Sequence, residues 1–199
     1  MTAPVFPFAD EEALVAALKA GEPAAYEQLI EQYAEQVYRV AFRLLQNAAD
    51  AEDALQEAFL AVYLRIGEFQ GEAKFSSWLY RIVTNKALDI IRKRQRKTEA
   101  ATDALEDLGD DAGEWIPDQQ ATLPEDWAER QEINDLIAEG LTHLSPKLRA
   151  AFVLFELEGL SMEEVAAALN VSPSAAKVRV HRARLALRQF LAQRLQVEQ

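Results

Sequence analysis

The sequence has 199 residues, half of them apolar, with 21 basic and 33 acidic residues and a formal net charge of −12. It has no cysteine and two histidines, which excludes disulfides, thiolate zinc sites and cysteine nucleophiles. Residues 10–12 are acidic where a secretion signal needs basic residues, and the sequence has no run of eighteen apolar residues. We therefore expect a cytoplasmic protein without direct membrane insertion.

The charges are distributed unevenly along the chain. Residues 74–97 hold eight basic residues and one acidic residue, and residues 172–195 hold six basic residues and no acidic one. Between them, residues 98–132 hold twelve acidic residues and one basic residue, together with two glycines and two prolines. Two local basic patches are compatible with nucleic-acid binding despite the negative total, and the segment between them has a linker composition.

This pattern predicts four segments. We expect a tail and short helix over residues 1–23, a helical domain over 24–97, an acidic linker over 98–132 and a helix-turn-helix domain over 133–195. Trp115 and Trp127 are unusual in a free linker. Either they fix short segments to a neighbouring surface, or the acidic segment occupies a nucleic-acid path as a charge mimic.

Within residues 24–97, apolar residues recur at spacings of three and four, as on amphipathic helices. We expect helices over about 24–47, 49–66 and 76–96, and no stretch alternates as a strand does. Leu55, Phe59 and Val62 are expected to face inward from the second helix. The fold class is therefore all-α, with two helical domains.

The second helix carries a polar face. Asp50, Asp53 and Glu57 are spaced i, i+3 and i+7, so they share one face, with Gln56 beside them. This face suits docking to a partner, and equally suits a solvated helix start where carboxylates favour the macrodipole. A di-iron site is excluded, because the sequence has no Glu-x-x-His motif.

The third helix begins with aromatic residues and continues with basic ones, as a nucleic-acid surface does. Phe75, Trp78 and Tyr80 could stack on unpaired bases or belong to the core, and we expect the role of Trp78 to be at least half structural. The candidate contacts of this region are Gln70, Lys74, Phe75, Ser76, Trp78, Tyr80, Arg81, Asn85, Lys86 and Arg92.

The C-terminal domain contains a helix-turn-helix pattern. Ser161 and Glu164 have capping-box spacing, and the short helix that follows is expected to bury Val165, Ala166 and Leu169. The chain turns at residues 170–171 and restarts at residues 172–173, where serine caps the next helix. A hairpin with a solvated basic face is the alternative. The candidate contacts on the second helix are Ser174, Lys177, Arg179, His181 and Arg182.

Two parts of the sequence resemble a known family. DAEDALQEAF (50–59) and FSSWLYRIVTNKALD (75–89) resemble region two of extracytoplasmic-function (ECF) sigma factors of the sigma-70 family, and residues 158–188 resemble its region four. The family commonly has Gly-Thr-Val-Lys-Ser-Arg where this chain has SAAKVR (174–179). The departure replaces a threonine by Ala175 and a serine by Val178, which removes two hydrogen-bonding groups.

The resemblance implies a transcription initiation factor that is not an enzyme and uses no cofactor. It implies that Asp50, Asp53, Gln56 and Glu57 bind core RNA polymerase, that region two opens the minus-ten promoter element around one extruded base, and that region four binds the minus-thirty-five element. It also implies an anti-sigma factor as a partner. The alternative is a conventional helix-turn-helix regulator that acts without polymerase. No Gly-rich phosphate loop, nucleophile elbow or metal-ligand cluster favours an enzyme.

Overall fold

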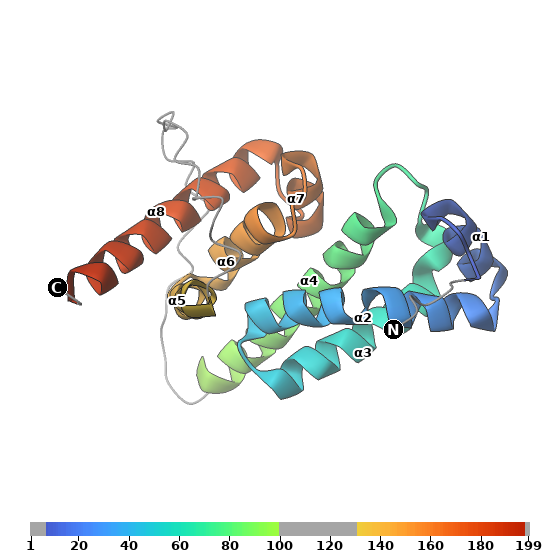
Figure 1. The fold of residues 1–199 in the computed structure, drawn as a ribbon, viewed down its shortest axis with the longest axis horizontal. Helices are drawn as coiled ribbons and strands as arrows, with labels where there is room; N and C mark the ends of the chain where they lie inside the picture. Colours follow the sequence, from blue (N-terminus) through green and yellow to red (C-terminus); the bar gives the residue numbers. More distant parts are fainter. Residues whose placement is uncertain (1–6, 100–130, 198–199) are drawn as a thin grey trace. The chain divides into compact units, whose positions relative to one another are not determined.

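The computed structural model describes residues 7–99 and 131–197, so the acidic linker expected at 98–132 lies almost entirely outside the described residues. All regular elements in the described ranges are helical, which confirms the all-α class (Figure 1). The contacts divide the chain into two compact units, Met1–Arg94 and Gln95–Gln199. None of the helices in the described part combines the length and apolarity needed to cross a membrane.

The first unit contains α1 (Glu11–Ala20), α2 (Pro23–Leu45), α3 (Ala48–Arg65), the 3-10 turn η1 (Ile66–Glu68) and α4 (Phe75–Glu99) as far as Arg94. The expected bounds of the three long helices agree with these to within three residues. Proline starts α2 at a position where its missing N–H costs nothing, and the Asn47 side chain caps α3 by accepting from the Asp50 N–H at 3.0 Å.

The α2–α3 pair forms the centre of this unit, with the two helices side by side. The face that α3 turns inward consists of Ala51, Ala54, Ala58 and Val62. Leu55 and Phe59, expected to face inward, are only half-buried. Small side chains along the buried stripe let the two helix backbones approach closely, which leaves the larger residues at the margin of the contact.

The second unit contains α5 (Gln131–Thr142), α6 (Pro146–Phe152), the π-helical turn η3 (Val153–Leu157), α7 (Met162–Leu169) and α8 (Pro173–Val197), with α5, α6 and α7 all packing on α8. The capping box at the start of α7 is confirmed, because Ser161 Oγ accepts from the Glu164 N–H and Glu164 accepts from the Ser161 N–H. Ala168 is buried, whereas Leu169, expected in the core, is half-exposed.

Candidate functional site

The outer face of α3 carries the four side chains that the sequence predicts for docking: Asp50, Asp53, Gln56 and Glu57. Two of these carboxylates already have basic partners on α4. Glu57 Oε2 lies 2.9 Å from Lys86 Nζ, and Asp50 forms an ion pair with Arg94. The hydrogen bond and the charge of Lys86 stabilise the ionised form, so they hold the pKa of Glu57 below its ordinary value. The predicted docking residues are therefore linked to the predicted DNA-binding helix.

The same face of α3 continues into an apolar stretch that sequence reasoning missed. Leu60, Tyr63 and Leu64 expose 58%, 61% and 70% of their surface, unusually much for large apolar residues. Leu60 follows Glu57 by three residues and Gln56 by four. Tyr63 follows Gln56 by seven residues, and Leu64 follows Glu57 by seven. The three residues therefore extend the acidic face toward the end of the helix. The signal that could have found them is their position opposite the inward set Ala54, Ala58 and Val62. We call Asp53, Gln56, Glu57, Leu60, Tyr63 and Leu64 together the docking face.

The candidate DNA contacts around α4 fall into three groups by exposure. Gln70, Lys74, Asn85 and Arg92 are exposed, Ser76, Arg81 and Lys86 are partly exposed, and Phe75, Trp78 and Tyr80 are buried. Arg92 lies 2.7 Å from Asp89 one turn away, an exposed pair that leaves the guanidinium accessible. Arg81, Asn85 and Arg92 are spaced by four and seven residues and therefore share one face of α4, whereas Lys86 points toward α3, where it pairs with Glu57.

Of the two alternatives for the three aromatic residues, stacking on bases or a place in the core, burial favours the core, in agreement with the structural role expected of Trp78. Phe75 is fully buried, and Trp78 and Tyr80 expose 8% and 7%. The Phe75 ring meets Tyr33 and Phe69 edge-on at centroid distances of 5.6 Å, and the Tyr80 hydroxyl lies 3.2 Å from Gln36 Oε1. The Phe75 and Trp78 rings pack with Phe69 beside the loop, and none of the three rings is exposed enough to form a stacking platform for bases.

The helix-turn-helix consists of α7 and α8. Asn170 ends α7 in the left-handed conformation with φ 53°, and Ser172 Oγ accepts from the Ala175 N–H at 3.2 Å to cap α8. Of the predicted contacts on α8, Ser174, Lys177 and Arg182 are exposed and His181 is partly exposed. Arg188, not among the predicted contacts, is also exposed and lies two turns beyond His181 on the same face.

Arg179 is the predicted contact that the structure places differently. Its side chain exposes only 9%, because it is three residues from Ala176 and four from Ala183, both fully buried. The Arg184 side chain also interacts with residues of its own unit. Its Nε donates to Glu156 Oε1 at 2.6 Å, and its guanidinium lies over the Phe155 ring. The expectation that Arg179 presents its guanidinium to DNA is therefore not supported by this arrangement.

Two segments of this chain match the models of known protein families. The model of sigma-70 region 2 matches residues 29–97, and that of sigma-70 region 4 matches residues 134–187. The ECF RNA polymerase sigma factor SigW of Bacillus subtilis is 35% identical over 177 residues, covering 87% of this chain and 92% of SigW. The chain belongs to the ECF RNA polymerase sigma factor family. RNA polymerase sigma-H factor of Pseudomonas aeruginosa is 31% identical over 89% of this sigma factor and 91% of its own length.

Solved structures agree with this sigma factor in fold. The CnrH chain in its complex with the cytosolic domain of CnrY aligns with a TM-score of 0.64 and 24% identity, covering 92% of this chain and 97% of CnrH. The sigma factor RpoE in its complex with the anti-sigma factor NepR from Bartonella quintana aligns with a TM-score of 0.61 and 23% identity, over 84% and 96% of the two chains. Sigma factors are non-enzymatic initiation factors, so family membership excludes an enzyme.

Proposed function

We propose that this sigma factor binds core RNA polymerase and directs it to specific promoters, region 2 recognising and melting the minus-ten element and region 4 binding the minus-thirty-five element. The observation that carries the proposal is that this chain contains both sigma regions, region 2 before region 4. The chain also aligns with nearly the full length of SigW. The polymerase supplies all catalysis, and this function needs no cofactor.

The docking face of α3 is our proposed contact with the polymerase. Its carboxylates supply the charge that would steer and orient a basic partner helix, and its exposed leucines supply the apolar area that would hold the partner. A partner helix with basic residues at one end and apolar residues at the other would match this surface. Asp50, which exposes 16% of its side chain and pairs with Arg94, supports the face from its edge.

We propose that the loop before α4 and the exposed side of α4 hold melted minus-ten DNA. Gln70, Lys74 and Ser76 would meet unstacked bases, and Arg81, Asn85, Lys86 and Arg92 would follow the phosphate backbone. The buried aromatic residues would support this surface from below. This assignment keeps the polar part of the sequence prediction and moves the aromatic part into a structural role.

For the minus-thirty-five element, we propose contacts from Ser174, Lys177, His181 and Arg182 at the start of α8, which would lie in the major groove. Arg179 would instead support the helix from the inside, as its burial implies. Ala175 and Val178 offer no polar group to a base edge, so a larger part of the affinity would come from phosphate contacts.

Three further proposals follow from family membership and charge. We propose that residues 24–97 and 133–195 act as the two functional domains, with 98–132 as an acidic linker between them. We propose the cytoplasm as the site of action, where the polymerase works. We also propose regulation by an anti-sigma factor, supported by the complex in which the related RpoE fold binds NepR.

In vitro transcription with core polymerase and genomic fragments tests the function. The intact chain should give specific transcripts. Asp53→Ala combined with Glu57→Ala, or Leu60→Ser combined with Leu64→Ser, should lower polymerase affinity by roughly tenfold or more and reduce transcripts in proportion. The reason is that truncation of an interface residue that carries binding energy costs more than about 1 kcal/mol. Fluorescence anisotropy of labelled protein with core polymerase measures the affinity directly.

Glu31→Ala is the matched control, because Glu31 is an exposed carboxylate on α2, a different helix from the one that carries the docking face. It should bind polymerase as the unmodified chain does. Absence of transcripts with the intact chain, together with tight binding to duplex DNA without polymerase, would replace the proposal by a conventional helix-turn-helix regulator.

A further inference from the structure

Glu11, in the first turn of α1, interacts with the start of a different helix. Its Oε1 accepts a hydrogen bond of 2.9 Å from the backbone N–H of Phe75, the first residue of α4 and 64 residues further along the chain. The first amide hydrogens of a helix have no partner within the helix, and a carboxylate at that end also favours the helix dipole. Asp10 caps α1 itself by accepting from the Ala13 N–H. Glu11 thus caps α4 from outside.

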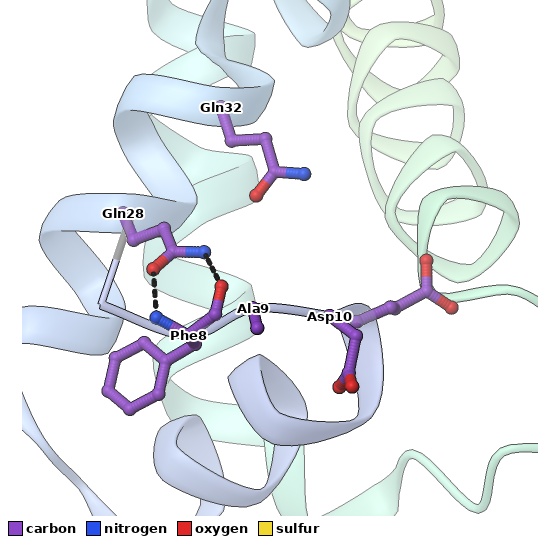
Figure 2. Close-up of a pocket in the computed structure, with 6 residues that line it drawn as sticks. Phe8, Ala9, Asp10, Gln28 and Gln32 are labelled. Carbon is purple, nitrogen blue, oxygen red and sulfur yellow. Dashed lines mark hydrogen bonds between the residues drawn. The ribbon is translucent and has the colours of Figure 1, made fainter. Parts of the chain in front are cut away.

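The helix that carries Glu11 is held firmly on α2. The buried side-chain amide of Gln28 accepts from the Phe8 N–H at 3.0 Å and donates to the Phe8 carbonyl at 2.9 Å, as Figure 2 shows. At the other end of α1, the Tyr26 hydroxyl donates to the Leu18 carbonyl at 3.0 Å. Because hydrogen bonds to α2 fix the chain at both ends of α1, the position of Glu11 is defined as well.

A second contact from α1 reaches the opposite end of the same loop. Lys19 Nζ lies 5.9 Å from the centroid of the Phe69 ring, and Phe69 packs against Phe75 and Trp78. Figure 1 shows α1 beside the turn that follows α3, in agreement with the contacts between α1 and η1. Residues 69 and 75, which flank the loop 70–74, are therefore both held by α1.

The loop itself is exposed along its whole length, and its conformation depends on its ends. Residues 70–74 are all exposed, and Gly71 has a φ of 76°, a conformation that side chains disfavour. A short segment without buried side chains of its own takes its shape from the residues that anchor it. Here those anchors are the Phe69 ring and the first backbone amide of α4.

We infer that Glu11 is a positioning residue for promoter opening: by capping α4 at Phe75, it holds the loop 70–74 in the arrangement that receives an unstacked base. The inference rests on the proposed function of region 2, and Glu11 itself does not touch DNA. Its effect is preorganisation, because a loop already held in its binding conformation loses less conformational entropy on binding. The helix α1 lies outside the residues matched by the region 2 model, which begin at residue 29.

The test compares Glu11→Ala, Glu11→Gln and the control Glu12→Ala, each in the full chain bound to core polymerase. Glu12 is an exposed carboxylate in the same first turn of α1. Anisotropy measures binding of single-stranded oligonucleotides carrying the minus-ten element of a promoter found by the transcription assay, and of the same strands with each base changed in turn. The ratio of the two affinities is the discrimination.

We expect Glu11→Ala to lower discrimination by roughly tenfold at the base that the loop receives, with polymerase affinity unchanged, as for the loss of one charge-assisted hydrogen bond. Glu11→Gln keeps an acceptor and should retain most of the discrimination, and Glu12→Ala should match the unmodified chain. Unchanged discrimination in Glu11→Ala would overturn the inference. So would an equal loss of affinity for polymerase and for all strands, which is the mark of a purely structural role. Lack of discrimination by the unmodified chain would instead count against the proposed function.

Discussion

The role of a charged residue in this sigma factor depends on the side of the helix on which the residue lies. Lys177 and Arg179 are two residues apart on α8, yet the first is exposed and the second exposes 9% beside buried alanines. Glu57 and Glu52 are likewise both exposed on α3, but only Glu57 reaches Lys86. A residue's charge therefore predicts its role only together with its position around the helix axis.

The Glu57–Lys86 pair makes a titration prediction. Since Lys86 lowers the pKa of Glu57, the ion pair stabilises the fold above the ordinary glutamate pKa of 4.5, and this contribution is lost as the pH falls through the lowered pKa. Both side chains are substantially exposed, so the contribution to stability is small. We expect Lys86→Met to raise the pKa of Glu57 toward its ordinary value, measured by NMR titration of the side-chain carboxyl carbon.

Lys86→Arg is the control for that titration, because it keeps a cation within reach of Glu57. It should leave the pKa of Glu57 low. If Lys86→Met left the pKa of Glu57 unchanged, Lys93, whose charge has the smaller effect, would have to be the main partner, contrary to the structure.

At the scale of elements, the packing of α5 on α8 depends on one glycine. A β-carbon on Gly140 would lie 2.7 Å from Leu187 Cδ2 and 3.1 Å from Phe190 Cδ1, both too close for an unchanged core. Arg149 of α6 holds the end of α5 as well, because its guanidinium donates to the Thr142 carbonyl at 3.2 Å. The position of α5 thus depends on close backbone approach and on capping from a neighbouring helix.

Gly140→Ala should destabilise the protein although alanine is the better helix former. The higher helix propensity would contribute about 1 kcal/mol, whereas overpacking a core costs about 1–3 kcal/mol. We expect a net loss of about 1 kcal/mol, seen in urea unfolding followed by circular dichroism. Gly67→Ala is the control, because its β-carbon would meet no atom within 4 Å, and the free energy of unfolding should stay nearly constant. A more stable Gly140→Ala protein would show that Leu187 and Phe190 move aside without cost.

For the whole molecule, the charge pattern joins a strongly acidic segment to two basic ones. The twelve acidic residues of 98–132 offset most of the charge of residues 74–97 and 172–195. Free DNA approaching either basic segment would meet repulsion from this acidic segment, and salt would screen it, since the Debye length is about 10 Å at 0.1 M ionic strength.

A variant with the acidic residues of 98–132 changed to asparagine and glutamine should therefore bind duplex DNA more tightly in the absence of polymerase. We expect roughly tenfold tighter binding in low salt and a shrinking difference as salt is added. Electrophoretic mobility shift or anisotropy titrations over a salt series measure it. A variant with the same residues in shuffled order keeps the charge and should behave as the unmodified chain. Equal affinities of the neutralised and unmodified chains in low salt would count against repulsion by this segment.

Much of the fold could be predicted from the sequence, because it depends on local signals. The capping box at Ser161, the turn at Asn170 and the three-and-four spacing of α2 to α4 are all short-range patterns. The contact between Glu11 and Phe75 could not be predicted, because no local sequence pattern indicates that two residues 64 positions apart lie in contact.

The candidate site was predictable in part for the same reason. The polar candidate residues were predicted by type and spacing and stay a prediction, but the burial of Phe75 depends on the aromatic neighbours that the tertiary fold supplies. Arg179 is different, because its spacing from Ala176 and Ala183 already indicated an inward position. The exposed leucines of α3 were overlooked because an apolar residue on a helix is first assigned to the core.

The ion pair between Glu57 and Lys86 has a thermodynamic consequence for assembly. Under the proposed function, its two members belong to surfaces for different partners, so a polymerase that engages Glu57 makes Lys86 available to promoter DNA. Thermodynamic linkage requires the effect to be mutual. Promoter DNA that binds Lys86 must raise the affinity of the sigma factor for polymerase by the same factor by which polymerase raises its affinity for DNA. An exposed pair is worth about 0.2–1 kcal/mol, which limits this cooperativity to about fivefold.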